Sequence, residues 1–208
     1  KKPLAEQLIN YELGYEFKTF FYSLGVNFYL MNYKDQLIPT GEKNSVGYDI
    51  MTNVPESFRR GVEITQAFKY NDFFRWDLSL TLSQNKIINF STWAYHYDKD
   101  WNETYQEIVL GDTDIAYSPS IIGSQKLIFT PFENFNISYI GKYVGSQYFD
   151  NTSSEDRMID AYFIQDVKLD YKFNIKTIGE IELKFMVNNI FDEKYVNNAY
   201  GGIWYEQG

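Results

Sequence analysis

The segment from Phe90 to Tyr105 holds the side chains best suited to binding chemistry, because aromatic rings and the single histidine of the chain are concentrated there. Aromatic faces stack on sugars and planar chelates and attract cations, and an imidazole can ligate a haem iron. The alternative interpretation is that these rings pack against neighbouring loops in an interfacial belt and that the histidine is solvated. The candidate ligand-binding residues are Trp93, Tyr95, His96, Tyr97, Trp101 and Tyr105.

Two groups of carboxylates are the next candidates, because carboxylate oxygens are calcium ligands. Neither group has the spacing of a defined calcium loop, so solvated loop charge is the favoured interpretation and no metal site is predicted. The first group is Asp98, Asp100, Asp112 and Asp114, and the second is Asp150, Glu155 and Asp156.

Glu180 and Glu182 resemble an acid/base pair, but they lie two residues apart in an alternating segment and therefore share one strand face. Lysines on the preceding strand make cross-strand ion pairs along a wet lumen the better explanation. The chain has no cysteine, and it contains no phosphate loop, nucleophile elbow or metal-ligand spacing. The sequence thus predicts no catalytic residue and no cofactor, and we expect that the protein is not an enzyme.

The composition indicates which elements must position these residues. In 208 residues, 44% are hydrophobic and 19% aromatic, yet the mean hydropathy is −0.41, so apolar and polar residues must be interleaved as they are in β-strands. No apolar run approaches the roughly 18 to 20 residues of a transmembrane helix. A net charge of −9 opposes a phosphate backbone, so no nucleic-acid partner is expected.

Strict alternation predicts about eight strands. The clearest runs from Phe74 to Ile87, where Phe74, Trp76 and Leu78 alternate with Arg75 and Asp77. The predicted strands lie at about residues 8–18, 22–30, 58–70, 74–87, 121–130, 135–144, 163–173 and 180–188.

The predicted connections alternate in length: short turns follow odd-numbered strands and long loops follow even-numbered ones. The long loops are expected at about residues 31–55, 89–119 and 145–160. Outer-membrane barrels have this asymmetry, and strands of roughly ten residues suit a tilted bilayer crossing. The predicted fold is therefore all-β, an antiparallel up-and-down transmembrane β-barrel.

Four stretches carry a resemblance to a known family. They are Asn10–Tyr15 (NYELGY), Asn53–Pro55 leading to Gly61–Ile64 (GVEI), Gly111–Ile115 followed by Ser118-Pro119, and Val187–Tyr195 (VNNIFDEKY). In this order they resemble the C-terminal part of the β-barrel of TonB-dependent outer-membrane receptors, especially of the Bacteroidetes type.

The resemblance implies that residues 1–208 are the C-terminal portion of such a barrel, about eight consecutive strands of a 22-strand barrel without its plug and final strand. It implies a location in the outer membrane of a Gram-negative bacterium, with membrane lipid and TonB as partners, TonB being contacted through an absent N-terminal region. The implied function is TonB-coupled import of a scarce nutrient such as a siderophore, haem, vitamin or glycan. Two alternatives remain open at this point: a complete small outer-membrane barrel, and a soluble carbohydrate-binding β-sandwich.

Overall fold

Alternating side chains place most of the chain in strands. The computed structural model describes residues 3–43, 45–97, 102–199 and 204–205. Within these residues the only helical element is the three-residue 3-10 turn η1 (Glu155–Arg157). It is too short to cross a bilayer. The strands are β1 (Gln7–Lys18), β2 (Tyr22–Lys43), β3 (Asp49–Lys69), β4 (Phe74–Tyr97), β5 (Glu103–Asp114), β6 (Ile121–Phe132), β7 (Phe135–Val144), β8 (Gln147–Tyr148), β9 (Met158–Ile159), β10 (Tyr162–Ile175), β11 (Gly179–Val187) and β12 (Trp204–Tyr205).

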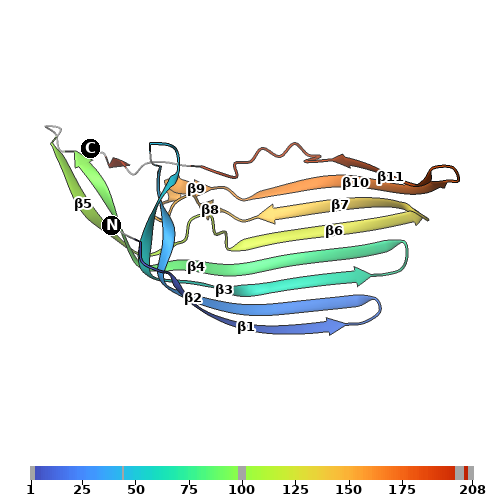
Figure 1. Cartoon of the computed structure of the whole chain (residues 1–208), viewed down its shortest axis with the longest axis horizontal. Coiled ribbons are helices and arrows are strands. Elements are labelled where there is room, and N and C mark those ends of the chain that lie inside the picture. Colours follow the sequence, from blue (N-terminus) through green and yellow to red (C-terminus); the bar gives the residue numbers. More distant parts are fainter. Residues whose placement is uncertain (1–2, 44, 98–101, 200–203, 206–208) are drawn as a thin grey trace.

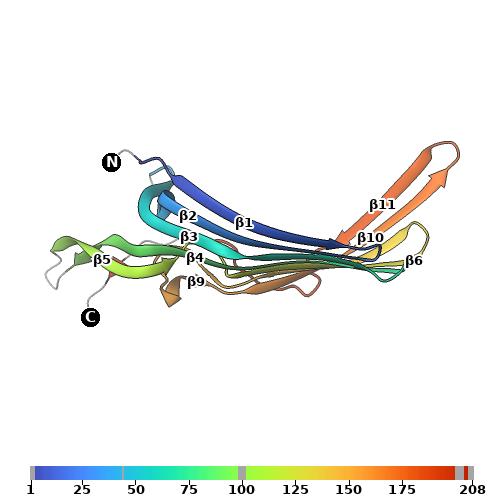
Figure 2. The same ribbon diagram turned by 90° about the horizontal axis from the view of Figure 1, so that it is seen from below.

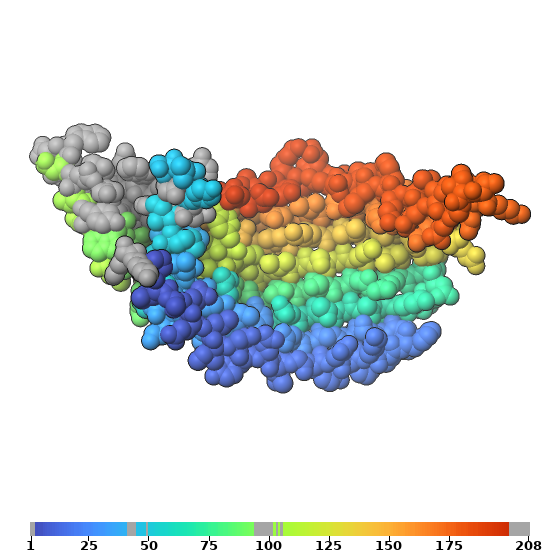
Figure 3. Space-filling model, in the orientation of Figure 1, coloured from blue at the N-terminus to red at the C-terminus, as the bar shows by residue number. Residues whose placement is uncertain are grey.

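One sheet contains ten of these strands, in the order β1-β2-β3-β4-β6-β7-β10-β11, with β5 and β12 paired to β4 (Figure 1). Neighbours in this order are antiparallel, so the predicted all-β, up-and-down fold is confirmed. Strands β1 and β2 follow one long edge and β10 and β11 follow the other (Figure 3). Seen from the side, β1 and the β10–β11 hairpin rise on the same side of the central strands, so the sheet is curved (Figure 2).

The sheet is open in the part of the chain that the structure describes, because β1 and β11 are its ends and do not pair with each other. A complete small barrel would need that pairing. A β-sandwich would need a second large sheet packed on the first, whereas the other sheet formed by described residues has only two strands, β8 and β9. Neither alternative fits this topology.

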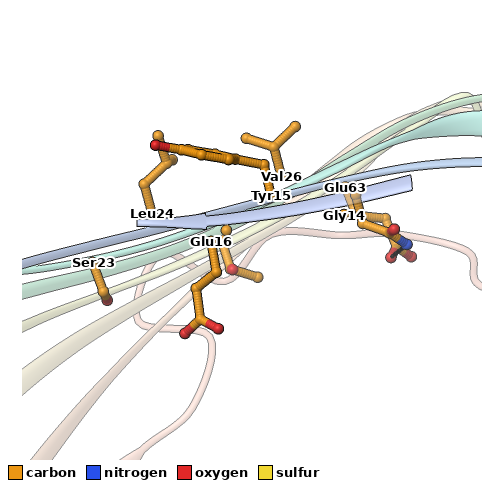
Figure 4. Close-up of a pocket in the computed structure, with 10 residues that line it drawn as sticks. Gly14, Tyr15, Glu16, Ser23, Leu24, Val26 and Glu63 are labelled. Atoms are coloured by element: carbon orange, nitrogen blue, oxygen red, sulfur yellow. Dashed lines mark hydrogen bonds between the residues drawn. The ribbon is translucent and has the colours of Figure 1, made fainter. Parts of the chain in front are cut away.

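The period of two gives the sheet one apolar and one polar face. Tyr15, Val26, Ile64 and Leu80 lie side by side across the first four strands. The next row on the other face runs from Glu16 through small and hydroxyl residues to Lys142. Tyr15, Leu24 and Val26 project from one side and Glu16 and Ser23 from the other (Figure 4). Such a two-faced sheet is typical of a barrel wall between lipid and an aqueous lumen.

The two ends of the sheet differ, as predicted. Turns of a few residues join β1 to β2, β3 to β4, β6 to β7 and β10 to β11 at one end, and the long connections lie at the other (Figure 1). Two of the predicted long loops, at residues 31–55 and 89–119, are largely strands, so these predictions are wrong. Strand β2 continues to Lys43 and the chain returns as β3, and β4 continues to Tyr97 and the chain returns as β5. Residues with positive φ, such as Asp35 and Asn89, interrupt the alternation of apolar and polar residues, so the sequence pattern did not predict these parts of the strands.

Candidate functional site

The candidate site lies where two long hairpins separate. Strands β3 and β4 pair from Lys69 and Arg75 up to Ser57 and Ile87. Beyond that point β3 remains paired with β2 and β4 pairs with β5 instead. The resulting hollow, which we call the hairpin crevice, has a volume of about 440 Å³ and is lined by Thr40 of β2, residues 50–55 of β3, and residues 87 and 89–93 of β4.

The floor of the hairpin crevice is apolar and the rim is partly exposed. Ile87, Val54 and Phe90 are buried and belong to a small hydrophobic core with Ile38 and Ile115. On the rim, the Trp93 side chain is 49% exposed. A hollow of this size with an apolar floor and polar groups at its margin is typical of small-ligand sites, which measure about 300 to 1,000 Å³.

A β-bulge places Phe90 and Trp93. The pairing of β4 with β5 shifts register on both sides of Phe90, and Asn89 and Gly111 have φ values of 49° and 76°. The Asp112 carboxylate accepts a hydrogen bond of 3.0 Å from the Asn89 backbone N–H. Because a bulge bends its strand and re-aims the following side chains, Phe90 faces the core while Trp93 remains at the rim.

Five of the six predicted aromatic and histidine residues lie in β4 or β5, so their assignment to a loop is wrong. Trp93 lines the hairpin crevice. Three others lie in β4 and one in β5, with Tyr95 opposite Tyr105 and His96 opposite Thr104. The side chains of Tyr95, His96, Tyr97 and Tyr105, and Trp101 as a whole, lie outside the described residues.

Sequence reasoning did not identify the β3 wall of the hairpin crevice. Asn53 fixes this wall: its amide donates hydrogen bonds to the backbone oxygens of Leu4 at 3.2 Å and Asp35 at 2.7 Å, and its oxygen accepts one of 2.8 Å from the Leu4 N–H. The signal was present, because Asn53 opens one of the four family-like stretches. Asn53 lies within β3, opposite Leu37 of β2.

The loop between β7 and β10 links the bases of the β2–β3 and β4–β5 hairpins through hydrogen bonds. Asn151, which is 2% exposed, donates to the Pro39 oxygen at 2.7 Å and accepts from the Ala116 N–H at 2.9 Å. Buried Asp150 pairs with Arg157 at 2.7 Å. One loop thereby contacts β2, the segment after β5 and its own return.

Several of the carboxylates considered as calcium ligands have other partners. Asp114 pairs with Lys86 at 3.0 Å. A hydrogen bond of 2.5 Å from the Ser154 hydroxyl lowers the pKa of the Asp156 carboxyl below its ordinary value. Asp98 and Asp100 lie outside the described residues. Among the side chains that the structure describes, no group of three or more His, Cys, Asp or Glu could hold a metal ion.

Glu180 and Glu182 lie in ion pairs, as predicted. Glu182 is directly opposite Lys172 at 3.6 Å and also contacts Lys184 at 2.9 Å, while Glu180 is 4.0 Å from Lys172. These pairs lie on the polar face of the β10–β11 hairpin, so the carboxylates belong to the wall and not to an acid/base site.

A second hollow, of about 530 Å³, spans β1, β2 and β3 (Figure 4). Two of its cross-strand rows are Gly14–Asn27–Glu63 and Glu16–Gly25–Thr65, so most of its lining lies on the polar face of the sheet. The two hollows differ in kind, because the hairpin crevice lies between two strands that diverge, whereas this one lies over paired strands.

Comparisons with known proteins place this sheet in a known context. The family model "TonB dependent receptor-like, beta-barrel" matches residues 3–190. No curated protein sequence matches the chain. Solved structures similar to it include the ferric yersiniabactin uptake receptor FyuA from Yersinia pestis (18% identity, TM-score 0.66, covering 95% of this chain and 27% of that one).

Two further similar structures are the FrpB iron transporter from Neisseria meningitidis and the ferric-catecholate import receptor Fiu from E. coli K12. FrpB is 16% identical with a TM-score of 0.62, covering 96% of this chain and 29% of that one. Fiu is 16% identical with a TM-score of 0.63, covering 94% of this chain and 25% of that one. The chain therefore spans about a quarter of the length of these structures.

Proposed function

The chain belongs to the TonB-dependent receptor β-barrel family, and from this premise we propose that it is part of the wall of a receptor that imports a scarce nutrient with energy coupled through TonB. Its location is the outer membrane of a Gram-negative bacterium. The members it resembles are receptors and transporters, so the proposed chemistry is binding and passage of a solute, with no bond made or broken.

One observation carries the proposal: the sheet is two-faced, curved and open at both edges. Leu13 and Leu183, near opposite edges, are 71% and 56% exposed on the apolar face. Exposing one such side chain to water costs about 1.5 to 3 kcal/mol. We therefore propose that lipid covers this face and that further strands continue the sheet from β1 and β11.

The remaining parts of the receptor are proposed to lie outside residues 1–208. They are the other barrel strands, a plug and the segment that contacts TonB. The solute would be a small molecule or glycan, in the range from siderophore, haem or vitamin to oligosaccharide. The hairpin crevice, at the end with the long hairpins, is the proposed place where this chain contacts the solute.

Uptake in the native host tests the proposal. We expect that deleting the gene that encodes this chain abolishes energised uptake of one scarce nutrient, that deleting TonB has the same effect, and that the complete gene restores uptake only when TonB is present. Uptake that continues unchanged without TonB would contradict it.

A further inference from the structure

Building on the proposed receptor function, we infer that the hairpin crevice binds a neutral oligosaccharide, with one sugar ring against the indole of Trp93. The inference concerns the solute class of that same site. The charge, the polarity and the strand edges of the lining residues support it.

Among the residues that the structure describes, those lining the hairpin crevice include no ionisable side chain, although 23% of the chain is charged and its net charge is −9. Of the charged groups nearby, Lys86 pairs with Asp114, and Glu107, opposite Trp93, accepts a hydrogen bond of 2.6 Å from the Ser91 hydroxyl and keeps its negative charge. An anionic chelate would therefore lose hydration there without gaining a cationic partner, and it would be repelled by Glu107. An uncharged ligand incurs no such cost.

The polar groups of the lining are hydroxyls and amides that both donate and accept hydrogen bonds. Thr52, Thr92 and Asn89 supply them, beside the apolar floor of Val54 and the exposed ring of Trp93. A sugar ring has the matching composition, because its C–H face packs on an aromatic ring while its hydroxyls reach the hydrogen-bonding groups at the margin.

A peptide is the competing uncharged occupant, because it could add a strand to an open edge. Both edges that face the hairpin crevice are interrupted. Pro55 removes one backbone donor from β3, and the φ of 49° at Asn89 departs from the extended backbone with which an added strand would pair along β4. Neither edge offers an extended peptide an unbroken row of partners.

Binding to the purified complete receptor in detergent tests the inference by isothermal titration calorimetry. The probes are malto-, xylo- and mannohexaose, with hexagalacturonate as the acidic saccharide, a ferric catecholate as the anionic chelate and an uncharged hexapeptide. We expect binding of at least one neutral hexasaccharide and none of the other three probes. Trp93→Ala should weaken it about tenfold and Trp93→Phe should restore most of the affinity.

The matched control is Val109→Ala, because Val109 is 75% exposed on the same hairpin and lies outside the hairpin crevice. It should leave saccharide binding unchanged, and a heat-induced shift in gel mobility checks that each variant is folded. Failure of all neutral saccharides to bind, tighter binding of the chelate or peptide, or equal effects of Trp93→Ala and Val109→Ala would overturn the inference.

This experiment separates the inference from the proposed function. Binding in detergent needs neither TonB nor a membrane. A receptor that takes up a ferric chelate in a TonB-dependent manner but ignores neutral saccharides keeps the proposed function and loses the inference. Saccharide binding without TonB-dependent uptake would keep the inference and contradict the proposed function.

Discussion

At the scale of single residues, the site is held by amides whose hydrogen bonds are long-range in sequence. Asn53 links the start of the chain to β2 and β3, and Asn151 links the loop before β10 to β2 and to the segment after β5. A buried donor or acceptor that loses its partner costs about 1 to 3 kcal/mol. These hydrogen bonds therefore fix the geometry of the hairpins, Asn53 from within the lining of the hairpin crevice and Asn151 from outside it.

Asn151 provides the prediction at this scale. Asn151→Ala leaves the Pro39 oxygen and the Ala116 N–H unpaired, and we expect it to destabilise the hairpin base by about 1 to 3 kcal/mol. The measurement is the rate of limited proteolysis within residues 145–161 of the complete receptor. The exposed Asn197, substituted by Ala, is the control. Equal cleavage rates in the two variants would contradict the assigned role of Asn151.

Asn151→Asp refines the prediction. The carboxylate can still accept from the Ala116 N–H but cannot donate to the Pro39 oxygen, which it would face with negative charge. Cleavage at least as fast as in Asn151→Ala is expected. Cleavage at the wild-type rate would mean that the contact with Pro39 is dispensable.

At the scale of elements, alternation predicted the barrel strands well and the hairpin extensions poorly. The strand predicted at residues 135–144 matches β7, and the one predicted at 74–87 matches the barrel part of β4. Those strands separate an apolar from a polar environment, so their sequences carry the period of two. Past Ile87, β4 borders a small core on one side and partly exposed residues on the other, and the bulge at Asn89 shifts the phase.

The candidate site was only partly predictable for the same reason. Trp93 was identified from its residue type, but the β3 residues that face it are about forty positions earlier in the chain. Only the pairing of β2 with β3 and of β4 with β5 brings them together. The spacing of residues in the sequence does not show that two hairpins diverge from a shared base, so it could not predict this contact.

Two adjacent residues of β4 test which face meets lipid. Leu80 lies in the apolar row beside Ile64, and Thr81 lies opposite Glu63 on the polar face. Leu80→Lys should destabilise the barrel by about 2 to 4 kcal/mol, because a lysine near the bilayer midplane loses its hydration. Thr81→Lys should be nearly neutral, since its ammonium group stays in the lumen near Glu63.

Denaturant unfolding of the complete receptor in lipid vesicles measures the difference. The two substitutions introduce the same side chain at neighbouring positions of one strand, so intrinsic strand propensity cancels. Equal destabilisation by both, or a larger effect of Thr81→Lys, would reverse the assignment of the faces.

At the scale of the whole molecule, one proposed property explains both the open edges and the uncovered apolar face: the sheet is a section of a larger barrel wall. A free edge exposes unpaired backbone groups, and lipid contains no water to satisfy them. Under this proposal, strands β1 and β11 each have a neighbour in the membrane. The family match over residues 3–190 and the coverage of about a quarter of similar receptors agree with that requirement.

The most direct test is a cryo-electron microscopy structure of the complete receptor in a lipid nanodisc. The predicted result is that β1 and β11 each pair with a strand from outside residues 1–208, with Leu13 and Leu183 facing lipid and Glu16 and Glu182 facing the lumen. A structure in which β1 pairs with β11 to close a small barrel, or in which protein covers the apolar face, would contradict the account.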